Sequence, residues 1–116
     1  MTSVYLRILL ALIFLSSFLQ KSDGHNEVWC IADEQIPEDV VQTALDWACG
    51  NGADCSKIQV NQPCFFPNTV RDHASFAFNN YYQNFKHTGG DCYFSAASII
   101  TNFDPSHDSC KFEYLP

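Results

Sequence analysis

The chain has 116 residues and a formal net charge of −7, with six Lys/Arg against thirteen Asp/Glu. Such an acidic chain disfavours nucleic acid and anionic lipid as partners, because binding to both depends on Lys and Arg side chains that neutralise phosphates. The length suits one domain, and six cysteines in so short a chain favour a disulfide-rich fold.

The first 24 residues have the pattern of a secretory signal peptide. Arg7 precedes an apolar run over residues 8–19, and polar residues with the small Ser22 and Gly24 follow it. The run of twelve residues is short for a membrane span, and we expect cleavage before His25. The remaining 92 residues hold four Lys/Arg and twelve Asp/Glu, a net charge of −8. We expect residues 25–116 to form a single secreted domain.

All six cysteines lie in the secreted part: Cys30, Cys49, Cys55, Cys64, Cys92 and Cys110. An even number in a small secreted chain predicts three disulfides, each stabilising the fold by roughly 2–4 kcal/mol. About fifteen pairings are formally open. The glycines and asparagine of residues 50–52 make a local bridge between Cys49 and Cys55 sterically plausible. A zinc site is disfavoured, because the chain has no Cys-x-x-Cys pair.

The first predicted helix opens at Pro37, carries acidic residues in its first turn and ends at Gly50. Asp46 and Trp47 lie off its apolar stripe, so either is a candidate for the border of a groove. We expect instead that Trp47 packs and that Asp46 is solvated. The stripe consists of Val41, Ala44, Leu45 and Ala48.

The second predicted helix, residues 67–86, is the centre of the domain. Thr69 with Asp72 three residues later forms a capping-box pattern, and Gly89-Gly90 marks the end. One stripe of this helix is assigned to the core: Ala74, Ala77, Phe78, Tyr81 and Phe85.

Phe76 and Tyr82 fall outside that stripe, in a sector shared with Asn79, Asn80 and Gln83. Rings beside amides suit a sugar, which offers apolar faces for stacking and hydroxyls for hydrogen bonds. The alternative is that both rings fill a second small core. The residues alone leave both interpretations open.

Beyond this helix, residues 91–94 and 111–114 alternate in the manner of two short strands, with a turn-rich loop over 95–109 between them. No motif for catalysis or for a metal or cofactor is present. There is no Gly-x-Ser-x-Gly or His-Glu-x-x-His sequence, and no feature singles out Asp46 and Asp91 as a glycosidase pair. We expect no enzyme activity and no cofactor.

Several motifs nevertheless form a recognisable set. They are Trp29-Cys30, Leu45-Asp46-Trp47-Ala48-Cys49-Gly50, His73-Ala74-Ser75-Phe76-Ala77-Phe78-Asn79, and Pro105-Ser106 before Cys110. Together with the order of the six cysteines, this set resembles the plant X-eight domain, carbohydrate-binding module family 43. The resemblance covers residues 28–112.

The resemblance implies a non-catalytic module that binds β-1,3-glucan, such as callose or laminarin-like chains, in the plant cell wall. It also implies a small α+β disulfide-rich domain, with two helices packed at an angle beside a small antiparallel sheet. The implied disulfides are Cys30–Cys92, Cys49–Cys55 and Cys64–Cys110. The segment between Cys92 and Cys110 is longer than expected for the family, and Tyr93-Phe94-Ser95-Ala96 stands where a glycine is common.

Taken together, the residues and the resemblance predict an apoplastic, monomeric β-1,3-glucan-binding protein without a lipid anchor, with a separate glucanase as a further candidate partner. The alternative is a secreted cysteine-rich defence or signalling protein with a protein partner. The predicted glucan contacts are Phe76, Asn79, Tyr81, Tyr82, Gln83 and Asp91.

Overall fold

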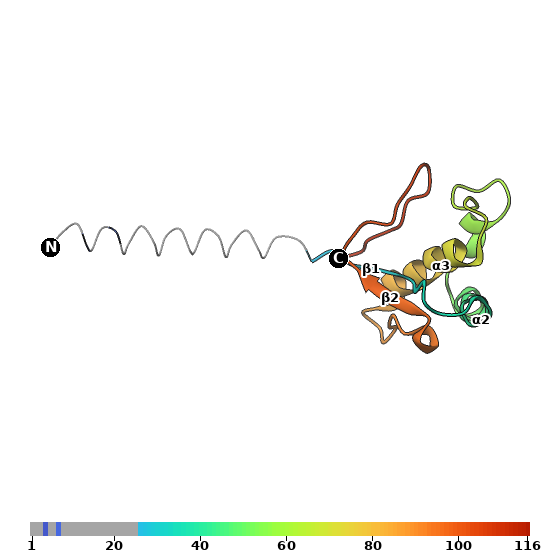
Figure 1. Ribbon diagram of the computed structural model, residues 1–116, viewed down its shortest axis with the longest axis horizontal. Helices are drawn as coiled ribbons and strands as arrows, with labels where there is room; N and C mark the ends of the chain where they lie inside the picture. The colour runs from blue at the N-terminus through green and yellow to red at the C-terminus, as the bar shows by residue number, and fades with distance from the viewer. Residues whose placement is uncertain (1–3, 5–6, 8–25) are drawn as a thin grey trace.

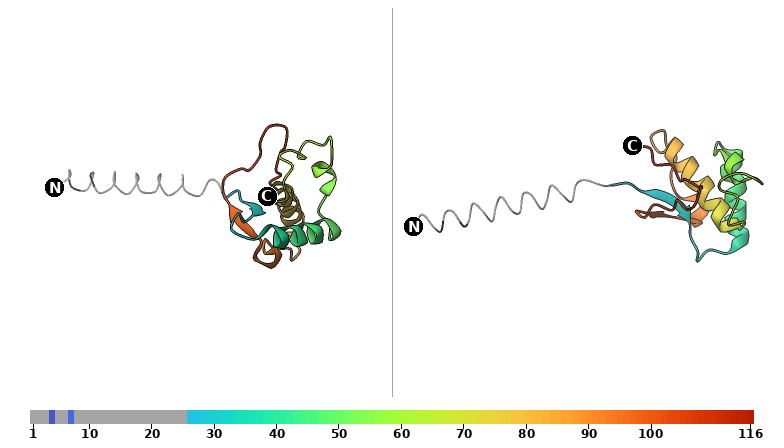
Figure 2. Two further views of the ribbon diagram at one scale, coloured as in Figure 1. Left: turned by 45° about the vertical axis from the view of Figure 1, so that its right-hand side comes forward. Right: turned by 90° about the horizontal axis from the view of Figure 1, so that it is seen from above.

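The computed structural model describes Val4, Arg7 and residues 26–116. Apart from Val4 and Arg7, the predicted signal peptide and its cleavage site lie outside the described residues. Two helices run at an angle beside a two-stranded antiparallel sheet, which confirms the predicted α+β architecture (Figures 1 and 2). In chain order the elements are β1 (Trp29–Ala32), α2 (Glu38–Gly50), a 3-10 turn (Cys55–Ile58), α3 (Val70–Phe85), a second 3-10 turn (Phe94–Ala96) and β2 (Ser98–Thr101).

Both helices begin as their sequences predict. Pro37 precedes α2, whose first turn carries Glu38 and Asp39. At the start of α3 the Thr69 hydroxyl accepts a hydrogen bond from the Asp72 backbone N–H at 3.1 Å, which satisfies a donor that the helix itself leaves unpaired. The predicted capping position is therefore confirmed.

The core lies where α2, α3 and β1 meet, and Phe78, Val41 and Cys30 are among its fully buried side chains. The loop after α2 is packed against the end of α3. Gly52 has a φ of +114°, and a Cβ at this position would lie 2.7 Å from Cζ of Phe85. Only glycine fits here, because both the backbone conformation and the neighbouring ring exclude a side chain.

The predicted strands over 91–94 and 111–114 are wrong. The sheet instead pairs β1 with β2, with Cys30 opposite Ile100. The segment 111–114 runs beside α3, where side-chain amides take the place of a partner strand: Nδ2 of Asn79 donates to the Glu113 carbonyl at 2.9 Å. The alternating pattern of residues 111–114 thus reflects packing against a helix. Alternation of apolar and polar residues alone does not distinguish this arrangement from a strand paired in a sheet.

Three disulfides cross-link the domain: Cys30–Cys92, Cys49–Cys55 and Cys64–Cys110. They match the pairing that the family resemblance implies. All six cysteines are bridged, which leaves no thiolate for zinc and fits an oxidising compartment. Among the described residues, no helix has the length and apolar character needed to cross a membrane.

Candidate functional site

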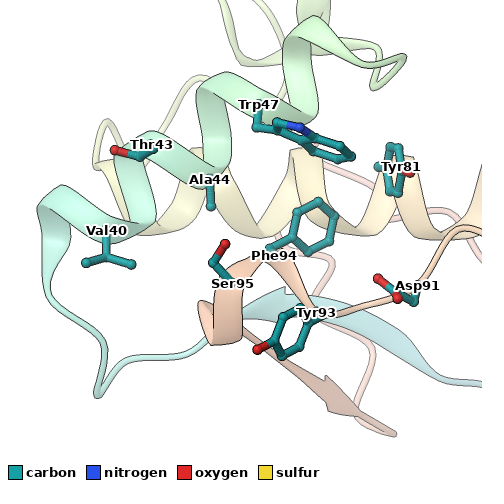
Figure 3. Close-up of a pocket in the computed structure, with 9 residues that line it drawn as sticks. All are labelled: Val40, Thr43, Ala44, Trp47, Tyr81, Asp91, Tyr93, Phe94 and Ser95. Carbon is teal, nitrogen blue, oxygen red and sulfur yellow. The ribbon is translucent and has the colours of Figure 1, made fainter.

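One cleft of the domain is lined mainly by aromatic side chains, and we call it the front cleft (Figure 3). It has a volume of about 460 Å³, within the range typical of small-molecule sites. Helices α2 and α3 form one wall, and the segment from Asp91 to the turn before β2 forms the other. The lining residues are Val40, Thr43, Ala44, Trp47, Tyr81, Asp91, Tyr93, Phe94 and Ser95.

Helix α2 contributes residues at positions i, i+3, i+4 and i+7, which lie on one side of a helix. These are Val40, Thr43, Ala44 and Trp47. Ala44 also belongs to the buried stripe, so this side of the helix borders the core directly. Trp47 packs against Tyr81, as expected, but the residue is also 50% exposed and lines the cleft. Asp46 is exposed, as predicted.

The rings of the cleft hold one another in place. Trp47 and Tyr81 meet edge to face with ring centroids 5.3 Å apart, and Phe94 contacts both at 6.1 Å and 5.4 Å. Beneath them, Phe94 stacks on the fully buried Phe78 with centroids 4.2 Å apart and an interplanar angle of 13°. The floor of the cleft is therefore fixed by the core, and its rings are ordered before any ligand arrives.

The opposite wall is an unusual turn. Phe94, Ser95 and Ala96 all have left-handed backbone conformations, with φ of 47°, 55° and 64°. Non-glycine residues adopt this conformation at a cost of about 1–2 kcal/mol each, so other contacts have to hold the turn. The Ser98 hydroxyl donates to the Tyr93 carbonyl at 3.1 Å, and the neighbouring Cys92 is bridged to the buried Cys30. As a result Tyr93 projects beside the cleft and is 63% exposed.

Polar groups lie around these rings. Thr43 and Ser95 supply hydroxyls, and Asp91 supplies the single carboxylate among the lining residues (Figure 3). Apolar rings with a few hydrogen-bonding groups are the combination that a neutral sugar requires. Two of the predicted contact residues, Tyr81 and Asp91, belong to this cleft.

Three other predicted contact residues are buried, and their predicted role as surface contacts is wrong. Phe76 is 3% exposed and packs edge to face on Phe112, with centroids 5.5 Å apart. Asn79 and Gln83 are 1% and 2% exposed, and their amides are engaged by the protein's own backbone. For Phe76 the second-core interpretation therefore holds.

Tyr82 is half-buried and lies outside the front cleft. The ammonium of Lys86 lies 5.7 Å from its ring centroid and 4.6 Å from that of Tyr114. The same ammonium donates to Oε1 of Gln83 at 2.7 Å, and desolvation lowers the pKa of Lys86 below its usual value. Tyr82 thus packs against the group that fastens the C-terminal segment to α3.

Sequence reasoning did not assign Trp47, Tyr93 and Phe94 to the site. A signal for Trp47 was present, because it continues the spacing of Val40, Thr43 and Ala44 beside the core stripe. No comparable signal marked Tyr93 and Phe94, because their positions depend on a left-handed turn of residues that do not favour one.

The structure does not bring Asp46 and Asp91 together. Asp46 accepts a hydrogen bond from Gln42 at 2.9 Å and lines a different hollow, whereas Asp91 lines the front cleft. Hydrolysis of a glycosidic bond ordinarily uses two carboxylates that flank it in one cleft. Within the described part of the chain, no group of three or more His, Cys, Asp or Glu is arranged to hold a metal ion.

The model of the X8 domain family matches residues 28–99. The chain belongs to this family. The match contains all of the front cleft and both strands up to Ile99, and the predicted resemblance is confirmed.

Individual relatives fall into two groups by length. The major pollen allergen Ole e 10 of Olea europaea is 43% identical over 88 residues, which cover 75% of this chain and 72% of the relative. Plasmodesmata callose-binding protein 1 of Arabidopsis thaliana is 38% identical over 104 residues, 89% of this chain and 52% of the relative. Glucan endo-1,3-beta-glucosidase 12 of the same plant is 51% identical over 89 residues, 76% of this chain but only 17% of that protein. The chain therefore spans less than a fifth of the length of such glucosidases.

Proposed function

We propose that this protein binds β-1,3-glucan without cleaving it, and that the front cleft is the binding site. The observation that carries the proposal is the preformed group of rings, Trp47, Tyr81 and Phe94, flanked by the exposed Tyr93 and by Asp91. The names of two kinds of relative support the choice of polymer, since one binds callose and the other acts on 1,3-β-glucan.

The chemistry of the cleft fits one face of a glucose chain. The CH groups of the sugar would stack on the exposed side of Trp47 and on Tyr93, while Asp91 and Thr43 would accept hydrogen bonds from its hydroxyls. Because the cleft is open and the polymer flexible, binding has to offset lost chain entropy, and the affinity will be modest.

The absence of catalysis is part of the proposal. A single carboxylate lines the front cleft, and the glucosidases share with this chain only a segment of 17–18% of their length. A secreted protein of the plant cell wall, with a separate glucanase as an additional partner, fits the three disulfides and the family membership.

The test is a titration of the 15N-labelled domain with laminarioligosaccharides, together with retention on insoluble curdlan. We expect amide shifts at α2, at Tyr81 and at residues 91–96, retention on curdlan, and no release of reducing sugar. Trp47→Ala should weaken binding at least about tenfold, because it removes the largest stacking surface. Phe103→Ala is the matched control, since this ring is 81% exposed and lines none of the cleft. Shifts confined to other surfaces, or an unchanged affinity of a folded Trp47→Ala variant, would reject the site.

A further inference from the structure

A second hollow lies on the opposite side of α2 from the front cleft. It has a volume of about 420 Å³ and is lined from α2 by Gln42, Leu45, Asp46 and Cys49. At about 100° per residue, this side of the helix is turned roughly 160° from the side that faces the front cleft. A short oligosaccharide in one hollow therefore does not reach the other.

This hollow continues into a larger one. Gln42, Val70 and His73 line both it and a neighbouring hollow of about 1010 Å³, which extends toward Thr69 and Ser75. We call the two together the rear furrow. A continuous furrow of this kind suits an extended polymer better than a compact ligand.

One end of the rear furrow carries an aromatic group that is fixed in place. Phe65 lines the furrow, and its ring centroid lies 4.9 Å from that of the exposed Phe66 and 5.6 Å from that of His73. A hydrogen bond of 2.7 Å between Nε2 of His73 and the Phe65 carbonyl ties the backbone that carries this ring to α3. The furrow thus has a stacking surface, as the front cleft does.

The furrow combines uncharged amides and hydroxyls with the four carboxylates of Glu34, Glu38, Asp46 and Asp72. Gln59 and Gln42 line the hollow that contains Phe65, and their Nε2 groups donate to the Cys55 carbonyl at 3.0 Å and to Asp46 at 2.9 Å, respectively. Both amide carbonyl oxygens remain to accept hydrogen bonds from a ligand. The guanidinium of Arg71 is engaged by the carbonyls of Asp33 and Ile36, which leaves an excess of carboxylates that disfavours acidic polysaccharides.

We propose that the rear furrow binds a second chain of neutral β-glucan, so that one molecule of this protein bridges two polysaccharide chains. The identity of the ligand rests on the proposed function of the front cleft. The existence of the second site rests on the furrow itself, with a fixed ring at one end and amides and hydroxyls along it.

The first experiment is the same titration with laminarihexaose, analysed at both places. Two sets of amide shifts are expected, one at the front cleft and one at Gln42, Gln59 and Phe65. Gln42→Ala, at an exposed helical position, removes one hydrogen bond and should weaken the affinity of the rear furrow about three- to tenfold. The affinity of the front cleft should stay unchanged. Gln62→Ala is the control, because this exposed glutamine lines neither hollow.

The second experiment measures bridging. Wild-type protein added to a long soluble β-1,3-glucan should raise light scattering at substoichiometric ratios, whereas Trp47→Ala and Gln42→Ala should each reduce scattering while still binding hexaose at the remaining site.

The outcomes separate the two proposals. Shifts at the front cleft alone, with a stoichiometry of one and no scattering, would overturn the rear-furrow proposal and leave the proposed function intact. Shifts at neither place would overturn both. Shifts of the rear furrow by a basic peptide but not by glucan would assign that surface to a protein partner and likewise overturn the inference.

Discussion

The side of α3 that carries Asn79, Asn80 and Gln83 and the side that carries Tyr81 both combine rings with polar groups, yet only the second opens into a cleft. The three amides, which we call the amide row, are at most 6% exposed. The Tyr81 side, in contrast, borders Trp47 and Asp91 across an open hollow. The same kinds of residue thus serve the fold on one side and a candidate site on the other.

The amide row forms hydrogen bonds with backbone groups that have no partner in a helix or sheet. Asn79 accepts from the Cys30 N–H at 3.2 Å and donates to the Glu113 carbonyl at 2.9 Å. Asn80 accepts from the Asp54 N–H at 2.7 Å, and Gln83 donates to the Val28 carbonyl at 3.0 Å. Segments that lie before, between and after the helices are thereby fastened to α3. A sheet of two strands leaves many backbone groups without partners, and buried amides satisfy them.

The largest expected effect comes from breaking this row. Asn79→Ala leaves the Cys30 N–H and the Glu113 carbonyl without partners, and each such buried group costs about 1–3 kcal/mol. We expect the free energy of unfolding, measured in guanidinium chloride with the disulfides intact, to fall by about 2–4 kcal/mol.

The control is Gln62→Ala, an exposed amide outside the helices and away from the amide row, which should change stability by less than about 0.5 kcal/mol. Equal losses for the two variants would show that the amide row is not a special support of the fold. Where the Asn79→Ala variant remains folded, glucan binding should persist, because none of its contacts lies in the front cleft.

The second largest expected effect concerns the front cleft, on the Tyr81 side of α3. Tyr93→Ala removes an exposed ring from the wall of the front cleft without touching the core, so we expect glucan affinity to fall about five- to tenfold with little change in stability. Isothermal titration with laminarihexaose measures the first quantity and thermal unfolding the second. A variant that binds normally would restrict the site to Trp47, Tyr81 and Phe94.

Much of the fold could be predicted because its signals are local. Pro37, the Thr69–Asp72 pair and the apolar stripes each mark a helix within a few residues, and these predictions are confirmed. The strands could not be predicted from alternation, because neither β1 nor β2 alternates, whereas the alternating segment 111–114 lies beside α3.

The candidate site was harder to predict for a physical reason. A ring beside an amide has the same sequence pattern whether the amide binds a sugar or the protein's own backbone. The amides of Asn79 and Gln83 form their hydrogen bonds with the backbone. The exposed side of Trp47 and the projection of Tyr93 result from tertiary contacts and from three consecutive left-handed residues, none of which has a local sequence signal.

A third, smaller effect separates two adjacent tyrosines. Tyr82→Ala should leave glucan affinity unchanged within about twofold, whereas Tyr81→Phe, which removes only the hydroxyl of a ring that lines the cleft, should reduce it by about two- to fivefold. Tyr82→Ala should instead lower stability by about 1 kcal/mol through the loss of its contact with the Lys86 ammonium. Loss of binding in a folded Tyr82→Ala variant would move the site to the C-terminal side of α3.

The smallest expected effect concerns Asp54, whose backbone is bound by the amide row while its side chain is exposed to solvent. The N–H of Asp54 is held by the buried Asn80, while its exposed carboxylate accepts from the Ser56 hydroxyl at 2.7 Å and from the Ser56 N–H at 3.1 Å. These two hydrogen bonds hold the pKa of Asp54 below its usual value. The carboxylate therefore stabilises the fold above the pKa of the unfolded chain, about 4, and this contribution is lost as the pH falls through the lower pKa of the folded state.

Asp54→Asn keeps the N–H that Asn80 binds but removes the titration. We expect the thermal midpoint of the wild type to fall slightly more than that of Asp54→Asn between pH 5 and pH 2.5, with a difference near the limit of measurement because the group is exposed. Asp104→Asn should behave in the same way, since hydrogen bonds from Ser106 also lower the pKa of Asp104. If Asp54→Asn instead destabilised the domain equally at every pH, its effect would come from a disturbed hydrogen bond between the Asp54 N–H and Asn80. The contribution of this loop to stability would then depend on the amide row and not on the Asp54 carboxylate.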